Sequence, residues 1–166
     1  MTRWILVGGR VGLFAWLGVA AAAGAEPRTI NGCRVEAATN CSFARFEKAD
    51  LRGVDLSDAS LHGAKMAGAD LRDARLRGAD LQVAVASGAD LRGADCEGAH
   101  LFAIDLRGAR LDGANLRGVN LQDAHLEGAS LAGADLTGAL LGTVRLDGAT
   151  WTDGRVCASP SQGACR

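Results

Sequence analysis

Residues 89–98 read Ala-Asp-Leu-Arg-Gly-Ala-Asp-Cys-Glu-Gly, two copies of a five-residue pattern that decides the fold. Each copy has a small apolar residue, a polar residue, a large apolar residue that we call the centre, a variable residue and usually Gly. The pattern extends in both directions without a register slip, from Ala44 to Trp151. Its centres are Phe46, Leu51, Leu56, Leu61, Met66, Leu71, Leu76, Leu81, Ala86, Leu91, Cys96, Leu101, Leu106, Leu111, Leu116, Leu121, Leu126, Leu131, Leu136, Leu141, Leu146 and Trp151.

A period of five residues suits neither an α-helix nor a continuous strand. On a helix, five residues advance about 500°, so successive centres fall about 140° apart and form no apolar stripe. On a strand, an odd period sends alternate centres to opposite faces. The small residue and the centre are two positions apart, however, and therefore share one face of a short extended segment. We expect each pentad to contain one such segment followed by a turn.

The residue two positions after the centre, usually Gly, suits the φ > 0 site of a type II turn. If each pentad turns one roughly right-angled corner, four pentads close a square of about twenty residues, and squares stack at roughly 4.8 Å. All Ala and Leu side chains then point inward. The sequence thus predicts an all-β solenoid of about five to six coils, about 25–28 Å long.

Several pentads resemble a known repeat signature. Ala49-Asp50-Leu51-Arg52-Gly53 and Ala134-Asp135-Leu136-Thr137-Gly138 are similar to the A(D/N)LXX motif of the pentapeptide-repeat family. This resemblance covers most of the chain after residue 25, and it implies the family's fold, a right-handed quadrilateral β-helix. The handedness comes from the resemblance and not from the period. The leucine-rich repeat is the nearest competitor, but its period is about 20–29 residues.

The first 25 residues have the features of a secretory signal peptide. Arg3 gives a positive start, residues 11–23 are apolar, and Ala23-Gly24-Ala25 is an A-x-A cleavage signal. We expect cleavage before Glu26, with an uncleaved N-terminal anchor as the alternative. The predicted organisation is a signal peptide at 1–25, an N-terminal cap at 26–43, the solenoid at 44–153 and a C-terminal tail at 154–166. The mature chain is expected to be periplasmic or secreted.

Four of the five cysteines flank the repeat, two at each end, which agrees with an oxidising compartment. The two ends of the predicted solenoid lie about 25 Å apart, which is too far for a disulfide between them. We therefore expect local disulfides, Cys33–Cys41 and Cys157–Cys165, the second of which staples the tail. Cys96 replaces Leu at a centre, so we expect a buried free thiol there.

Residues twenty apart should stack on one wall of the solenoid, which makes the outer surface readable. On one wall the residues before the centres are Asp50, Asp70, Asp90 and Arg110, and those after the centres are Arg52, Arg72, Arg92 and Asp112. The two columns carry opposite charge and switch sign at the same coil. We expect a lattice of exposed ion pairs, each worth at most about 1 kcal/mol. The alternative is a site for an acidic or phosphate group on the Arg column.

A less charged wall is the candidate contact surface. It contains His100 and Leu140, and at neighbouring positions Phe102 and Val83 replace the usual polar residue and Gly. Val85 lies close by, in the coil whose centre is only Ala86. An exposed apolar cluster on a polar protein is typical of a protein-contact site. The alternative is that Val83 or Val85 turns inward to fill the space that a Leu would occupy.

The remaining signals favour a protein without catalytic activity. The net charge of −1 implies no polyelectrolyte partner, so nucleic acid is not expected. His62, His100 and His125 do not share a column, so no metal site is expected, and no catalytic triad, P-loop or dinucleotide motif predicts a catalytic residue or cofactor. We expect a binding or scaffold module with an unknown protein partner and no stable membrane insertion after signal cleavage.

Two other functions follow from the same features. A structural envelope part or self-assembling spacer would associate through a solenoid end, such as the Trp151 end, and a homodimer could form there. The resemblance also implies the DNA-mimicking, gyrase-protecting role of the best-known family members. That role depends on a strongly acidic exterior and a cytoplasmic location, and this sequence departs from both with its balanced charge and its export signal.

Overall fold

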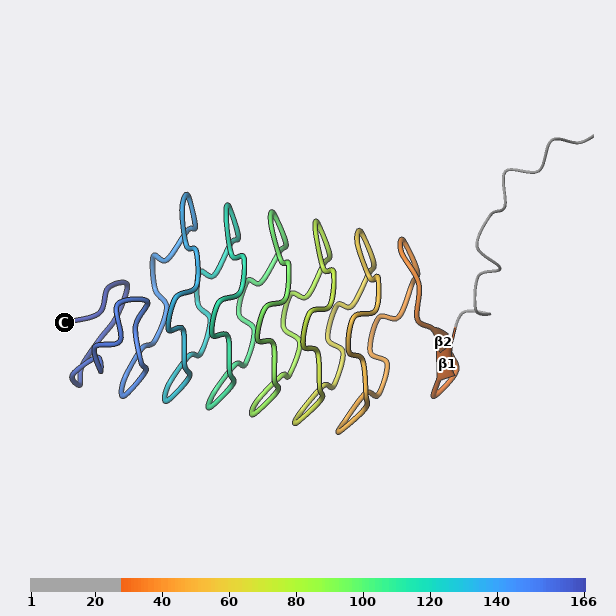
Figure 1. Cartoon of the computed structure of the whole chain (residues 1–166), viewed down its shortest axis with the longest axis horizontal. Helices are drawn as coiled ribbons and strands as arrows, with labels where there is room; N and C mark the ends of the chain where they lie inside the picture. Colours follow the sequence, from red (N-terminus) through yellow and green to blue (C-terminus); the bar gives the residue numbers. More distant parts are fainter. Residues whose placement is uncertain (1–27) are drawn as a thin grey trace, which may run out of the picture.

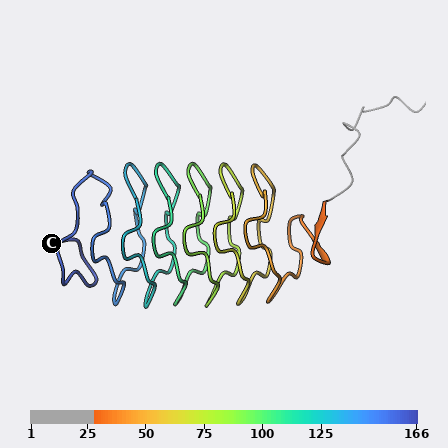
Figure 2. The same cartoon turned by 90° about the horizontal axis from the view of Figure 1, so that it is seen from below.

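A computed structural model describes residues 28–166, which form a single solenoid of stacked coils (Figure 1). The predicted signal peptide lies outside the described residues. Isolated parallel bridges join residues twenty apart, from Asn40 with Ser60 to Ser130 with Thr150. This confirms the coil of four pentads, and the same stacked coils appear when the molecule is turned by 90° (Figure 2).

Adjacent coils are held together by backbone hydrogen bonds on every wall. The N–H of the centre Leu91 donates to the carbonyl of Arg110 in the next coil at 2.7 Å, and the N–H of Arg110 donates to the carbonyl of Ala89 at 2.9 Å. Because the centre and the residue before it point their amides in opposite directions, each wall is a parallel ladder only a few residues wide.

The four walls are named here after one residue of each bridge column. The Asp90 wall contains Asp50, Asp70, Asp90, Arg110, Ser130 and Thr150. The Asp95 wall contains Asp55, Arg75, Asp95, Asn115 and Asp135. The His100 wall contains Asn40, Ser60, Asp80, His100, Asn120 and Leu140. The Asp105 wall contains Lys65, Val85, Asp105, His125 and Arg145, with Arg45 in the first coil.

Each corner is a tight turn of the kind that the glycine spacing predicts. At one corner the N–H of Ala94 donates to the carbonyl of Leu91 at 3.0 Å, and Gly93 between them has φ = 67°. A residue without Cβ takes this left-handed conformation at little steric cost. One corner differs, since Thr143 is outside the left-handed region and its hydroxyl accepts the N–H of Asp123 at 3.0 Å.

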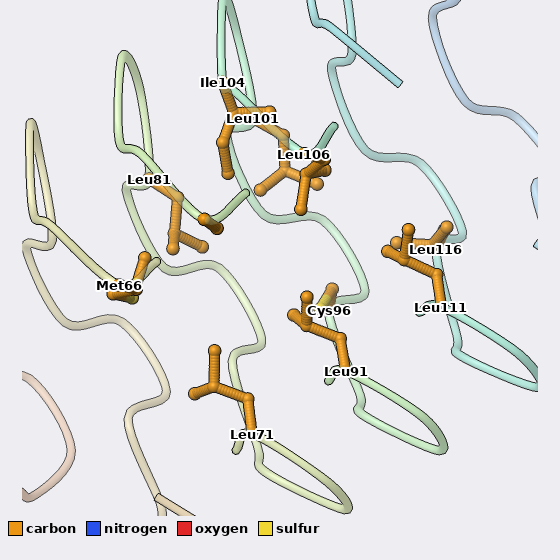
Figure 3. A pocket seen from close by; sticks show the side chains of 11 residues that line it. Met66, Leu71, Leu81, Leu91, Cys96, Leu101, Ile104, Leu106, Leu111 and Leu116 are labelled. Carbon is orange, nitrogen blue, oxygen red and sulfur yellow. The ribbon is translucent and has the colours of Figure 1, made fainter. Parts of the chain in front are cut away.

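The core is a column of centres and small residues along the solenoid axis. Nearly all are buried, and Figure 3 shows Leu81, Leu91 and Leu101 directed into the interior together with their neighbours. Each buried Leu contributes on the order of 1.5–3 kcal/mol. The coil with the two small centres Ala86 and Cys96 leaves an apolar cavity of about 10 Å³. Ile104, which replaces the usual Ala in the next coil, helps to line this cavity.

The N-terminal cap is a short antiparallel hairpin of β1 (Thr29–Ile30) and β2 (Cys33–Arg34). Side chains from this cap cover the first coil. Arg28 donates to the carbonyl of Asp50 at 3.0 Å, and Asn31 donates to the carbonyl of Arg45 at 2.6 Å. These bonds occupy backbone acceptors that no earlier coil can reach, and so protect an open sheet edge.

The coil begins one pentad before Ala44, where the sequence signature starts. Asn40 already bridges to Ser60, and Cys41 occupies a centre and is buried. This pentad was not predicted because Thr39 and Cys41 stand where Ala and Leu are usual. At the other end, the tail reverses direction and pairs antiparallel, Val156 with Thr150 and Gln162 with Arg145. The tail therefore closes two of the four walls.

Candidate interaction surface

Three successive coils of the Asp90 wall carry bidentate ion pairs, whereas the reversed pair of the next coil, Arg110 and Asp112, has its charged atoms 3.9 Å apart. Arg92 donates to both carboxylate oxygens of Asp90 at 2.8 and 2.6 Å, and Arg72 and Arg52 bind Asp70 and Asp50 in the same way. Each of these guanidinium groups is therefore already occupied by a carboxylate of its own coil. This geometry favours the predicted ion-pair lattice over a binding site for an anionic ligand.

These ion pairs predict acid sensitivity. The side-chain hydrogen bond from Arg92 and the backbone N–H of Arg92 lower the pKa of Asp90, and the matching arginines lower the pKa of Asp70 and Asp50. Because these pKa values are lower in the folded chain, the stabilisation is complete above the unfolded value of about 3.9 and is lost as pH falls through the folded values. We expect a constant melting temperature from about pH 7 to 5 and a decrease below about pH 4. Circular dichroism melts across this pH range test the prediction. A melting temperature that rises below pH 4 would contradict it.

The Asp95 wall is also charged, but several of its pairs connect different coils. Arg77 binds Asp95 at 3.1 Å and Glu97 at 2.8 Å, and Arg117 binds Asp135 at 3.0 Å. At the corner between this wall and the His100 wall lies an open groove of about 380 Å³. It is lined by Glu97, Gly98, Arg117, Gly118, Thr137 and Gly138.

The His100 wall differs from these two walls because it contains no Lys or Arg, either in its bridge column or at the following turn. Its column, defined above, contains one carboxylate, Asp80, and ends in Leu140, which is 54% exposed. Protein interfaces are depleted of charged residues at their core and enriched in aromatic residues. The wall has this composition, since Phe102 is 37% exposed at its edge.

The corner after the His100 wall departs from the glycine rule. Its six positions are Phe43, Gly63, Val83, Ala103, Asp123 and Thr143, whereas each of the other three corners has four or five glycines. Val83 has φ = 49° and Ala103 has φ = 53°. A β-branched residue at positive φ is a genuine outlier, and such strain persists only where the surrounding structure enforces it. The chain thus accepts backbone strain where it places apolar side chains outside.

The structure places the predicted contact residues on two walls and a shared corner. Val83 is 46% exposed at the corner, beside Phe102, and Val85 is 37% exposed on the Asp105 wall. Both valines therefore point outward, and the space at Ala86 remains the small cavity described above. His100 is exposed in the middle of its wall, and Leu140 lies two coils farther on.

Phe43 extends this surface and was missed from the sequence. It is 69% exposed, its ring packs edge-to-face with His62 at a centroid distance of 5.6 Å, and it covers the position where Gly63 lacks a side chain. A Cβ on Gly63 would come within 2.6 Å of the Phe43 ring. The available signal was that position 43 continues the corner column of Val83, one pentad before the signature begins.

Val83→Gly is expected to raise the free energy of unfolding by about 0.5–1 kcal/mol. Relief of the left-handed strain, about 1–2 kcal/mol, exceeds the entropic cost of Gly, about 0.5–1 kcal/mol. The reverse change Gly113→Val is the matched comparison, because Gly113 has φ = 66° and open space around its missing Cβ. It is expected to lower stability by about 0.5–1 kcal/mol, because the same two contributions apply with opposite sign. Urea unfolding of both variants measures this, and a destabilised Val83→Gly variant would show that Val83 serves the fold.

The cysteines lie where the predicted local disulfides require them. The Cα atoms of Cys33 and Cys41 are 5.5 Å apart and those of Cys157 and Cys165 are 4.8 Å apart, so both pairs are placed to form disulfides. Burial raises the pKa of the Cys96 thiol to about 12. That thiol is therefore protonated and unreactive at neutral pH.

Among residues 28–166, no three His, Cys, Asp or Glu side chains are grouped to hold a metal ion. The part of the chain that the structure describes contains no helix of membrane-spanning length and hydropathy. The exposed surface consists of the strongly charged Asp90 and Asp95 walls, the Asp105 wall, which mixes charged and apolar residues, and the His100 wall with its apolar corner.

Comparison with known protein families identifies the repeat. A family model described as pentapeptide repeats, in eight copies, matches residues 39–78, 69–108 and 104–142. The chain belongs to the pentapeptide-repeat family. Pentapeptide-repeat proteins are generally structural or binding proteins. The family's right-handed β-helix confirms the fold and handedness that the sequence resemblance implies.

Several solved pentapeptide-repeat proteins are similar to this chain. One from the Arabidopsis thaliana thylakoid lumen is 30% identical, with 68% of this chain and 86% of that chain covered and a TM-score of 0.62. Rfr23 from the cyanobacterium Cyanothece 51142 is 33% identical over 54% of this chain and 62% of its own, with a TM-score of 0.45. QnrB1, a plasmid-mediated fluoroquinolone resistance protein, is 22% identical over 72% and 75%, with a TM-score of 0.47. No curated protein sequence matches the chain.

Proposed function

We propose that this pentapeptide-repeat protein is an exported, non-enzymatic interaction module that presents the His100 wall and its apolar corner to a protein partner. One observation supports this function above the others. The wall without Lys or Arg is also the wall bordered by the strained, exposed Val83 and by Phe102. Polyanionic partners need clustered cations, so this wall suits a protein better than nucleic acid.

Two features support a location in the periplasm or outside the cell. The thylakoid-lumen relative is a pentapeptide-repeat protein that lies outside a cytoplasm. The two cysteine pairs are placed for local disulfides, which persist in oxidising compartments. Fractionation of the tagged full-length chain, expressed in a bacterium with two membranes, tests the location. Recovery of the reduced protein in the cytoplasm would overturn it.

The function is tested by affinity capture from envelope extracts with two forms of the protein. The wild type is expected to retain a specific partner, and the Val83→Ser/Phe102→Ser double variant is expected to lose it with almost unchanged melting, because both side chains are exposed. Ala132→Ser is the matched control, since Ala132 follows a centre on the Asp90 wall as Phe102 does on the His100 wall. Equal capture by the double variant would show that this surface does not bind the partner.

A further inference from the structure

The C-terminal end of the solenoid is paired on two walls and open on the other two. The tail, residues 154–166, turns back at this end (Figure 1) and pairs with the last residues of the Asp90 and Asp105 walls. Within residues 28–166, no bridge continues the Asp95 wall beyond Asp135 or the His100 wall beyond Leu140. These two walls follow each other along the chain and meet at one corner, so they form one continuous open edge.

The backbone of this open edge has unpaired hydrogen-bonding groups. Among the residues that the structure describes, no group accepts the N–H of Leu136, Gly138 or Leu141. In the same part of the chain, no group donates to the carbonyls of Ala134 and Ala139. The corresponding groups of the earlier coils on these walls all bond to the next coil. A row of unpaired N–H and C=O groups is a ready template for a further strand.

The core is also incompletely covered at this edge. The centres Leu136 and Leu141 are partly exposed, whereas every centre from Phe46 to Leu131 is buried. Leu146, which is closer to the C-terminus but lies beneath the tail on the Asp105 wall, is fully buried. Exposure of the core thus follows the two open walls and not the distance from the C-terminus.

The tail does not continue these walls in register. Twenty residues after Asp135 comes Arg155, whose N–H donates instead to the carboxylate of Asp153 at 3.0 Å. Twenty residues after Leu140 comes Pro160, which has no N–H to contribute to a ladder. The hydrogen-bonding groups and apolar side chains of the edge therefore stay available beside the folded tail.

We propose that this open edge binds an extended segment of a partner protein as an added parallel strand. Strand addition takes its affinity from backbone hydrogen bonds and its specificity from pockets for alternate side chains. The stacking of the earlier coils fixes the register, with a small residue over Ala139 and large apolar residues over Leu136 and Leu141. The site lies at the end of the solenoid, so it is additional to the surface at Val83 and Phe102 and does not depend on it.

The outer face of the edge adds a preference at one position. Neighbours in a bridge column are about 4.8 Å apart and their side chains make contact. Leu140 is 54% exposed, so the residue added beside it is expected to be apolar. Asp135 is already bound by Arg117 at 3.0 Å, so the residue added beside Asp135 is expected to be polar and uncharged. The peptide Ala-Asn-Leu-Ser-Gly-Ala-Val-Leu, followed by two Lys for solubility, meets these requirements.

Titration of the ¹⁵N-labelled protein with this peptide tests the site by NMR. Saturable shifts are expected at the amides of Leu136, Gly138 and Leu141, and their hydrogen exchange should slow. N-methylation of the peptide's Asn and Val, whose N–H groups would donate to Ala134 and Ala139, should weaken binding at least about tenfold. N-methylation of its two Leu residues is the matched control, because their N–H groups would face away from the edge. It should leave the affinity nearly unchanged.

Protein variants locate the site. Leu140→Ser is expected to weaken peptide binding about two- to fivefold. Val156→Ser is the matched control, since Val156 is also exposed at this end but belongs to the tail on the Asp90 wall. The Val83→Ser/Phe102→Ser variant should bind the peptide as the wild type does, so failure of this site and failure of the proposed function are separable.

The proposal is overturned if the peptide causes no saturable shift at these amides or if the two N-methylated peptides bind equally. Equal peptide binding by the wild type and Leu140→Ser would overturn the register. Hydrogen-exchange protection of the same amides that increases with protein concentration, without peptide, would identify a second copy of the chain as the occupant and overturn the partner segment.

Discussion

Leu126→Ala is expected to lower the free energy of unfolding by about 3–4 kcal/mol. This is within the range measured when a buried Leu is truncated and the surroundings cannot collapse into the cavity. Leu126 is a centre and is almost fully buried. The coils above and below are fixed by hydrogen bonds on every wall, so the space left by the side chain cannot close. For a chain of this length, the melting temperature should fall by roughly 10 °C.

Leu140→Ala is the matched control. Leu140 has the same side chain and lies fourteen positions farther along, but it precedes a centre and points outward. Its replacement is expected to change stability by no more than about 0.5 kcal/mol. Chemical unfolding at low protein concentration measures both variants without a contribution from association. Similar losses for Leu126→Ala and Leu140→Ala would contradict the assignment of inward and outward positions.

Deletion of residues 81–100 is expected to leave a folded, cooperatively melting protein. The deletion removes one coil and joins Asp80 to Leu101, so the pentad pattern continues as Ala79-Asp80-Leu101-Phe102. Because each coil contacts only its neighbours, the coils on either side can stack directly. The deleted coil contains the small centres Ala86 and Cys96, so the cavity should disappear with it.

The control deletion removes residues 81–97, three fewer. It joins Asp80 to Gly98 and shifts every later centre out of register. The later Leu side chains can then face the core only if the three surplus residues, 98–100, bulge out of the wall at the joint, which breaks the ladder there. We expect a lower melting temperature by circular dichroism for the 17-residue deletion than for the 20-residue deletion. Equal melting of the two deletions, or an unfolded product from the 20-residue deletion, would contradict the twenty-residue coil.

The sequence predicted the repeat well because its geometry leaves few choices. A five-residue period forces a turn in every pentad, and the stacking of residues twenty apart then places the column of Asp90 beside the column of Arg92 on one wall. The predicted turn glycines have the left-handed conformation, as Gly93 illustrates. In such segments, the local five-residue spacing also determines which residues of adjacent coils are in contact.

The ends and the strained corner were less predictable. Residues 154–166 have no period of five, so the antiparallel return of Val156 along Thr150 could not be inferred. Phe43 lies before the recognisable signature, so its exposure beside His62 was missed. The groove at Gly98 was also missed, although the glycines that leave it open, Gly98, Gly118 and Gly138, are twenty residues apart in the sequence.

Thiol cross-linking tests the coil length most directly. Arg72 and Arg92 are twenty residues apart on the Asp90 wall, whereas Arg77 and Arg92 are fifteen apart and lie at different corners. Cys96 is buried with a raised pKa and should not react. A reagent that spans about one strand spacing, roughly 4.8 Å, is expected to join the cysteines of Arg72→Cys/Arg92→Cys and not those of Arg77→Cys/Arg92→Cys. Efficient cross-linking of the second pair, or none of the first, would contradict a four-sided coil of twenty residues.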